Sequence, residues 1–458
     1  MNVYRFRKIF TSSPLYKFRS AHTQKFARAE TQDIEVLPKE DAKVTQIESG
    51  ITIASIENYN PISQVSLVLK AGSRYETAQN LGVSHVLHNC ATLSTKNRTG
   101  FCITRSLELL GAKLEVTATR EHLIYTLQCI RDDIDSGFEI LADIITRQAF
   151  KPWEVNDAIP RMHVDLAVYQ SNPEAVLLEN LHKAAFRSGL SNSLYCPSFM
   201  IGKHSSEMLH TFVKENFATS RTSVVGLGVS HEHLQNCVNK FLHVSSSSSG
   251  SDIATKFSGG EIRVETDLPC VHTAIVAEGA GLQNKKDVLS LGILQNILGA
   301  GSHSKFSCSK FSKLGEAAAK NTSNPFAVTT LNVNYSDSGL FGVYIVGNSD
   351  DMKELVKAVV SQMRDVTKSI SESSVNSAKH KLKARLNLER ETSKGLISAM
   401  AFEASQFGGI SDIQDIEKSI ESLTVSDITT IAGKVMKTKP AMAAIGRLHN
   451  TPHLDELI

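Results

Sequence analysis

The order of strand and helix patterns is the same in the two halves of the chain, on either side of a serine-rich segment. In the first half, alternation over residues 65–69 predicts a strand, and helical spacing over residues 82–95 predicts a helix. The second half begins in the same way, with a strand pattern over residues 271–277 and a helix pattern over residues 288–298. The repeat is one of order and spacing, and it predicts two homologous α+β domains.

The serine-rich segment between the halves predicts the domain boundary. Ser245 to Ser249 form an unbroken run, and Gly250 and Ser251 follow it. Such a sequence has nothing to bury, so we expect Ser245 to Ser251 to be exposed and mobile, within a linker over residues 244–257. The chain then divides into an N-terminal domain over residues 46–243 and a C-terminal domain over residues 258–458.

The amino terminus differs in composition from the rest of the chain. Residues 1–29 contain seven Lys and Arg and no Asp or Glu, and Glu30 is the first acidic residue. A basic, hydroxyl-rich, acid-free segment is typical of a mitochondrial transit peptide, and residues 30–45 then read as a polar arm. The alternative is a basic tail that binds nucleic acid or is disordered. Removal of the segment would leave 42 basic and 47 acidic residues, which gives no support to nucleic-acid binding.

Two absences limit the class of protein. No stretch reaches the roughly 18–20 consecutive apolar residues of a membrane helix, so membrane contact would come through partners. The seven cysteines are scattered, odd in number and without a CxxC pair. This pattern favours free thiols in a reducing compartment over a disulfide framework or a zinc ribbon.

Two histidines, His85 and His88, lie three positions apart in the helix predicted over residues 82–95. Side chains at this spacing share a helix face, and imidazole is a common zinc ligand. Histidine pairs of this kind are frequent without a metal, so the spacing alone favours structural histidines.

The surrounding sequence resembles the pitrilysin-type zinc peptidase family (M16). The likeness rests on a strand followed by residues 71–76 (AGSRYE), then Leu81 and Gly82, then the helix with the histidines. Active members carry HxxEH on this helix, in which two zinc-ligand histidines flank a glutamate base, and a further glutamate ligand on a later helix. The resemblance implies that each domain is a mixed β-sheet with helices packed on one face.

This chain departs from the catalytic motif. His85 matches the first histidine, whereas His88 replaces the base and Asn89 replaces the second histidine. The distal glutamate should fall near residues 164–166, where Asp165 is the nearest carboxylate. Catalysis needs three ligands, an open position for water and a carboxylate base. We therefore predict a degenerate motif with no catalytic residue and no bound metal.

Further strings resemble the core subunits of the mitochondrial cytochrome bc1 complex, which belong to the same family. They include residues 194–197 (LYCP), 259–263 (GGEIR) and 335–342 (YSDSGLFG). The resemblance implies a non-catalytic structural subunit of ubiquinol–cytochrome c reductase (respiratory complex III), an oxidoreductase complex, without a cofactor of its own. It would lie on the matrix side of the inner membrane, in a dimeric complex with core protein 1, cytochrome b, cytochrome c1 and the Rieske protein.

Two other functions are weighed against this prediction. One is a subunit of a mitochondrial processing peptidase, which is a metalloendopeptidase of the same family. The other is a free metal-binding protein that uses His85, His88 and Asp165. Outside the motif, the lone Trp153 follows Pro152 and is expected to be a packing anchor. The glycines at residues 299 and 301 are expected to end a helix, because the segment lacks the GxxxxGK[ST] pattern.

Overall fold

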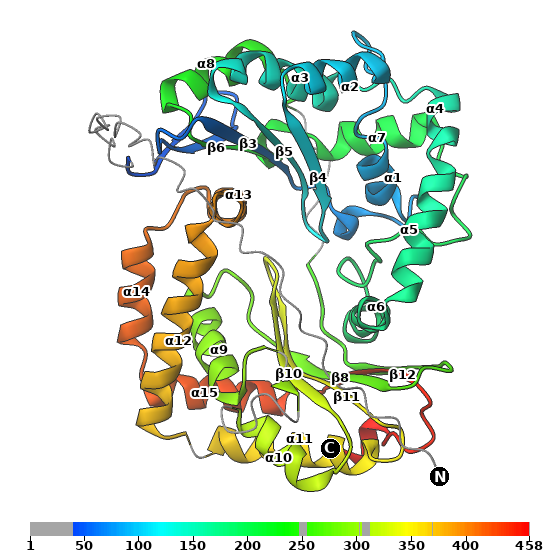
Figure 1. Ribbon diagram of the computed structural model, residues 1–458, viewed down its shortest axis with the longest axis vertical. Helices are drawn as coiled ribbons and strands as arrows, with labels where there is room; N and C mark the ends of the chain where they lie inside the picture. The colour runs from blue at the N-terminus through cyan, green and yellow to red at the C-terminus, as the bar shows by residue number, and fades with distance from the viewer. Residues whose placement is uncertain (1–39, 247–253, 302, 305–311, 369, 458) are drawn as a thin grey trace, which may run out of the picture. The chain divides into compact units, whose positions relative to one another are not determined.

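The computed structural model describes residues 40–246, 254–301, 303–304, 312–368 and 370–457 (Figure 1). The predicted transit segment and most of the serine run lie outside these residues, so the predictions made for them stay predictions. Among the described helices, none has both the length and the apolar character needed to cross a membrane.

The first half of the chain forms a six-stranded sheet in the order β1-β2-β6-β3-β5-β4. Its strands are β1 (Lys43–Gln46), β2 (Thr52–Ile56), β3 (Ile62–Leu69), β4 (Lys113–Ala118), β5 (Leu123–Ile130) and β6 (Thr222–Leu227). Only the pair β2 and β6 is parallel. β1 begins at Lys43, inside the range predicted to be a polar arm, because its backbone pairs with β2 although its side chains are largely exposed.

The second half forms a six-stranded sheet in the order β7-β12-β8-β11-β10-β9. Its strands are β7 (Gly260–Glu265), β8 (Val271–Glu278), β9 (His303–Ser304), β10 (Ala327–Asn334), β11 (Gly339–Gly347) and β12 (Ala441–Gly446). The pair β7 and β12 is parallel and the others are antiparallel. The series β7-β12-β8-β11-β10 thus repeats the series β2-β6-β3-β5-β4 in chain order and direction. The predicted α+β fold with two homologous domains is confirmed.

Helices follow the strands in both halves. The first half contains α1 (Val83–Asn89), α2 (Gly100–Leu109), α3 (Ile134–Thr146), α4 (Pro152–Asp157), α5 (Ile159–Ser171), α6 (Pro173–Ala185), α7 (Ser206–Asn216) and α8 (His231–Phe241). The second half contains α9 (Lys285–Leu298), α10 (Lys313–Asn321), α11 (Met352–Lys368), α12 (Glu372–Glu391), α13 (Ser393–Phe407), α14 (Ile413–Ser422) and α15 (Val425–Lys437). Most of them pack on one face of the sheet of their own half and form its main core.

The opposite face of each sheet is covered by a helix from the other half (Figure 1). Leu177 and Leu181 of α6 pack against Val276 of β8 and Ala443 of β12. In the same way, α13 packs its apolar side chains on β2, β3 and β6. Helices α6 and α13 occupy corresponding places in the chain, since each comes before the last strand of its own half. The exchange is therefore reciprocal, and each half completes the core of the other.

A buried ionic network accompanies this exchange. The guanidinium of Arg74 binds the carboxylate of Glu121 at 2.7 Å and that of Asp337, from the β10–β11 turn, at 2.5 Å. Glu121 also accepts a hydrogen bond from the Ser336 backbone N–H at 3.1 Å. Arg74 is 3% exposed, so its charge depends on these partners rather than on water.

Two local predictions are wrong. The helix predicted to reach residue 95 ends at Asn89, because Ser94 and Thr95 leave the helix path and bind the carboxylates of Glu154 and Asp143. Trp153, the expected packing anchor, is 63% exposed and lies against the Lys151 ammonium at the start of α4. The glycine prediction is confirmed, since α9 ends at Leu298 and Gly299 follows with φ of 134°.

Candidate degenerate metal site

Helix α1 carries the motif, and its first turn is held by a buried carboxylate. Glu76 accepts hydrogen bonds from the backbone N–H groups of Gly82 (2.7 Å) and Ser84 (2.9 Å). It therefore performs the role of an N-cap side chain from six residues upstream. Burial raises the pKa of Glu76 to about 7. Gly82 has φ of 84°, and a Cβ there would lie 2.5 Å from Cys196 Cα, so this position requires glycine.

Both ring nitrogens of His85 are engaged. The backbone N–H of Cys196 points to Nδ1 at 3.3 Å, and Asp165 Oδ2 lies 3.3 Å from Nε2. An amide can only donate, so Nδ1 accepts and the proton of the neutral ring is carried on Nε2 toward Asp165. Burial lowers the pKa of His85, which favours this neutral form. A metal could bind His85 only by replacing one of the two hydrogen bonds.

Asn89 occupies the space between His85 and Asp165. Its Nδ2 donates to Asp165 Oδ2 at 3.0 Å and to the His85 backbone carbonyl at 3.2 Å. Both amide hydrogens are used, so the nitrogen faces Asp165 as a donor. The amide oxygen, the atom of Asn that a metal could bind, is buried and has no hydrogen-bond partner among the described residues. In an active member of the family, the carboxylate at this position would face a metal cation. In this chain the Asp165 carboxylate faces the N–H groups of the Asn89 amide and the His85 imidazole.

His88 points elsewhere. Its Nε2 lies 3.1 Å from the carbonyl oxygen of Val116 in β4, to which it donates. Burial also lowers the pKa of His88. The imidazole at the position of the family's glutamate base is therefore neutral and hydrogen-bonded to a strand.

The structure thus brings together His85, Asn89 and Asp165 of the predicted site. The ring of His88 lies parallel to that of His85 with the centroids 6.4 Å apart, but its hydrogen bond goes to β4 and not to the other three residues. Within the described residues, the group of three potential ligands whose donor atoms converge lies elsewhere, at Asp135, His233 and Cys237. Sequence reasoning missed Cys196, which enters the site through its backbone. It also missed Tyr195, whose ring lies edge-on to His85 with the centroids 5.6 Å apart. The LYCP string was recognised but indicated no contact with α1.

Comparisons with known proteins define the class to which this site belongs. Residues 52–198 match the insulinase family (peptidase family M16), and residues 203–382 match the peptidase M16 inactive domain. The chain therefore belongs to peptidase family M16.

Individual relatives are more specific. The chain is 39% identical to cytochrome b-c1 complex subunit 2, mitochondrial, of Homo sapiens, over 91% of this chain and 92% of the relative. Identity to the Mus musculus protein of the same name is 40%, over 92% and 93%. A probable mitochondrial-processing peptidase subunit alpha-2 of Arabidopsis thaliana is 28% identical, over 91% and 84%.

Proposed function

We propose that this chain is the non-catalytic core subunit of the mitochondrial ubiquinol–cytochrome c reductase, respiratory complex III, and that it serves assembly and stability. The observation that carries the proposal is the near full-length similarity to cytochrome b-c1 complex subunit 2, at 39–40% identity. The similarity to a processing-peptidase subunit covers the same length at 28%. The chain is not a peptidase by itself.

The residues of the motif on α1 support the proposal that this subunit is not catalytic. The hydrogen bond from Asn89 occupies Asp165 Oδ2, and the one from the Cys196 backbone to Nδ1 keeps the proton of neutral His85 on Nε2, the nitrogen that faces Asp165. The side chain at position 88 is an imidazole bound to a backbone carbonyl, and it offers no carboxylate to accept a proton from water. We infer that no zinc binds here and that no residue of this motif is catalytic.

Exposed apolar side chains support membership of an assembly. Phe101 and Leu109 of α2 are 77% and 76% exposed, and Val164 and Val168 of α5 are 61% and 63% exposed. Large apolar side chains at such exposure are candidates for burial by partner subunits. The proposed partners are core protein 1, cytochrome b, cytochrome c1 and the Rieske protein, in a dimeric complex.

The proposed location is the matrix side of the mitochondrial inner membrane. The similar proteins named above are mitochondrial, and the described helices include no membrane span. Attachment would then be peripheral and would run through the membrane subunits. Residues 1–29 would direct import and be removed.

The rival is a subunit of a processing peptidase, which the 28% similarity supports. A cleavage assay separates the two. Purified core protein 1 is incubated with a presequence peptide, with and without this chain, and with a form in which His85 is changed to Ala. The proposal predicts that His85→Ala changes no measured rate. Cleavage that requires this chain would establish the rival, as a catalytic subunit if His85→Ala abolishes cleavage and as a substrate-binding subunit if His85→Ala leaves it unchanged.

A further inference from the structure

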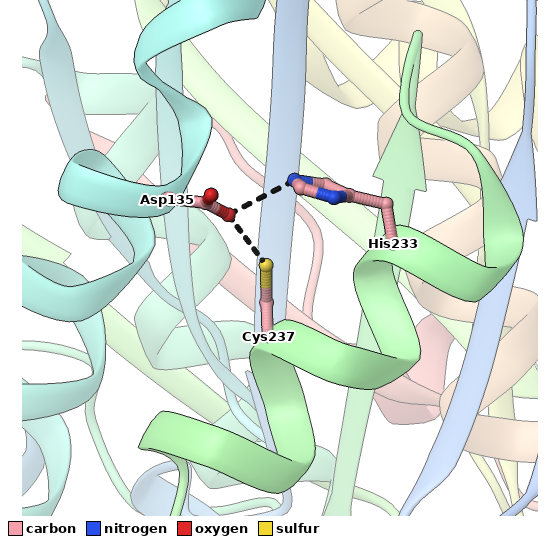
Figure 2. Close-up of side chains that lie close together, drawn as sticks. All are labelled: Asp135, His233 and Cys237. Carbon is pink, nitrogen blue, oxygen red and sulfur yellow. Dashed lines mark hydrogen bonds and ion pairs between the residues drawn. The ribbon is translucent and has the colours of Figure 1, made fainter.

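Three potential metal ligands converge between two helices of the first half, away from the motif on α1 (Figure 2). Asp135 lies in the first turn of α3, and His233 and Cys237 lie on α8. A separation of four positions places His233 and Cys237 on the same face of α8. Figure 2 shows their side chains directed toward the Asp135 carboxylate.

The two helices are fixed with respect to each other by the core. Ile134 and Phe138 of α3 belong to the same buried cluster as Leu234 and Val238 of α8. The three ligands are therefore presented by rigid elements, whose backbones need not reorganise when an ion binds. A site built on helices holds its geometry better than one built on loops.

The donor atoms are close enough to share one ion. His233 Nε2 lies 2.9 Å from Asp135 Oδ1, and Cys237 Sγ lies 3.1 Å from the same oxygen. All three donor atoms lie within 4.8 Å of one another. Zinc bonds of about 2.0–2.3 Å at tetrahedral angles separate ligand atoms by about 3.3–3.8 Å. An ion thus needs these two contacts to open by roughly half an ångström.

The surroundings permit this movement and the entry of an ion. The side chains of Asp135 and His233 are 62% and 43% exposed, so both can adjust. They line a surface pocket of about 340 Å³ together with Asp132 and Ser230. Cys237 closes the inner side of the site and is 4% exposed. The site has a buried sulfur on one side and solvent, the source of a fourth ligand, on the other.

We propose that Asp135, His233 and Cys237 bind one zinc ion, with water as the fourth ligand. Thiolate sulfur, imidazole nitrogen and carboxylate oxygen are the three donor types that proteins use for zinc, and four-coordination is the rule. The thiolate selects against magnesium and calcium, which take oxygen ligands. The ion would join α3 to α8 at the surface of the first half.

Zinc binding releases one proton, which comes from the thiol of Cys237. The Cys237 thiol, which now donates to Asp135, loses its proton to solvent, and the thiolate forms the bond to the metal. The Asp135 carboxylate can only accept, so the His233 Nε2 that contacts it carries the ring proton; on binding, this proton moves through solvent to Nδ1, and Nε2 gives its lone pair to the metal. The Asp135 carboxylate gives one oxygen. The inference does not depend on the proposed role in complex III.

The test measures zinc and cobalt binding to the purified full chain. Zinc is quantified after dialysis against a zinc buffer, and Co²⁺ is the spectroscopic probe, because a thiolate ligand gives a sulfur-to-cobalt charge-transfer band. The wild type is expected to hold about one equivalent of zinc and to show this band with Co²⁺. Loss of an outer-shell partner alone costs roughly 10- to 100-fold in affinity, so His233→Gln and Cys237→Ser should each cost more than about 100-fold.

Matched controls assign the ion to this site. Cys102→Ser removes an exposed thiol elsewhere, and His85→Gln alters the motif on α1; both should retain one equivalent and the cobalt band. His233→Gln changes a partly exposed residue, so its loss of binding cannot be ascribed to a failure to fold. The inference is overturned if the wild type retains no zinc, if Cys237→Ser or His233→Gln binds as tightly as the wild type, or if His85→Gln abolishes binding.

Discussion

Leu181 tests whether the exchanged helices make the two halves one cooperative unit. It belongs to α6 of the first half, is 1% exposed and packs in the core of the second sheet. Replacement of a buried Leu by Ala removes apolar contacts and leaves a cavity, at a cost of 2–5 kcal/mol. We expect Leu181→Ala to lower the free energy of unfolding by about 3 kcal/mol.

The expected loss of about 3 kcal/mol corresponds to different shifts in Tm, depending on whether the two halves unfold together or separately. The unfolding entropy is about 2.1 cal/mol/K per residue. If about 400 residues unfold together, a loss of 3 kcal/mol lowers Tm by roughly 3–4 °C. If the second half, about 200 residues, unfolds alone, its own transition falls by roughly 7 °C and the first half is unaffected.

The assay combines calorimetry with amide hydrogen exchange of peptides from β6 and β12, one from each sheet. We expect one transition and equal loss of protection in both strands. The control, Val164→Ala on the neighbouring α5, removes a 61% exposed side chain and should cost less than about 0.5 kcal/mol. Loss of protection confined to β12, with a separate transition shifted by about 7 °C, would refute the coupling.

Three further predictions concern buried polar groups. Arg74→Met leaves two carboxylates without their cation and should lower the unfolding free energy in denaturant titration by about 3–5 kcal/mol. Burial raises the pKa of Glu76 from 4.5 to about 7, so between these pH values the folded state retains a proton that the unfolded state releases. The free energy of unfolding should therefore fall by at most about 3 kcal/mol from pH 4.5 to 7 and stay level above pH 7. Glu76→Gln should remove this dependence on pH. Restoration of the motif with His88→Glu and Asn89→His should give weak zinc binding and little cleavage, whereas addition of Asp165→Glu, one methylene longer, should improve zinc binding.

Each of these has a result that would contradict it. Stability of the Arg74 variant within 1 kcal/mol of the wild type would mean that the network between the halves is dispensable. An unchanged pH slope in the Glu76 variant would assign that slope to other groups. The zinc measurements on the rebuilt motif are made in a Cys237→Ser background, so that the site on α8 does not contribute. Stoichiometric zinc in that background without the motif changes would contradict the degenerate site.

The order of elements was predictable because alternation and helical spacing are local. The order of strands within each sheet, with its parallel pairs β2–β6 and β7–β12, was not predicted, and neither was the exchange of α6 and α13. The spacing of apolar residues such as Leu181 and Met400 indicates that one face of their helix is buried. It does not indicate which of the two sheets covers that face. Helix length at α1 was overestimated because Thr95 is held by a carboxylate distant in sequence.

At the motif, sequence identified the residues and the structure supplied their directions. The replacement of a histidine by Asn89 was visible, whereas the hydrogen bond of Asn89 to Asp165 depends on α5 packing against α1. The turn of His88 toward Val116 depends on where β4 lies. The group on α3 and α8 was missed because Cys237 and Asp135 are 102 positions apart, and His-x3-Cys on a helix is a weak signal by itself.

The central claim is that this chain is a structural subunit of complex III, and native electrophoresis of mitochondrial membranes tests it most directly. Membranes are solubilised in mild detergent, and the chain, detected with an antibody, is compared with cytochrome b. The account predicts that both migrate in one high-mass band, and that depletion of the chain removes cytochrome b from that band. Migration of the chain apart from cytochrome b, in a soluble fraction that cleaves presequence peptides, would contradict it.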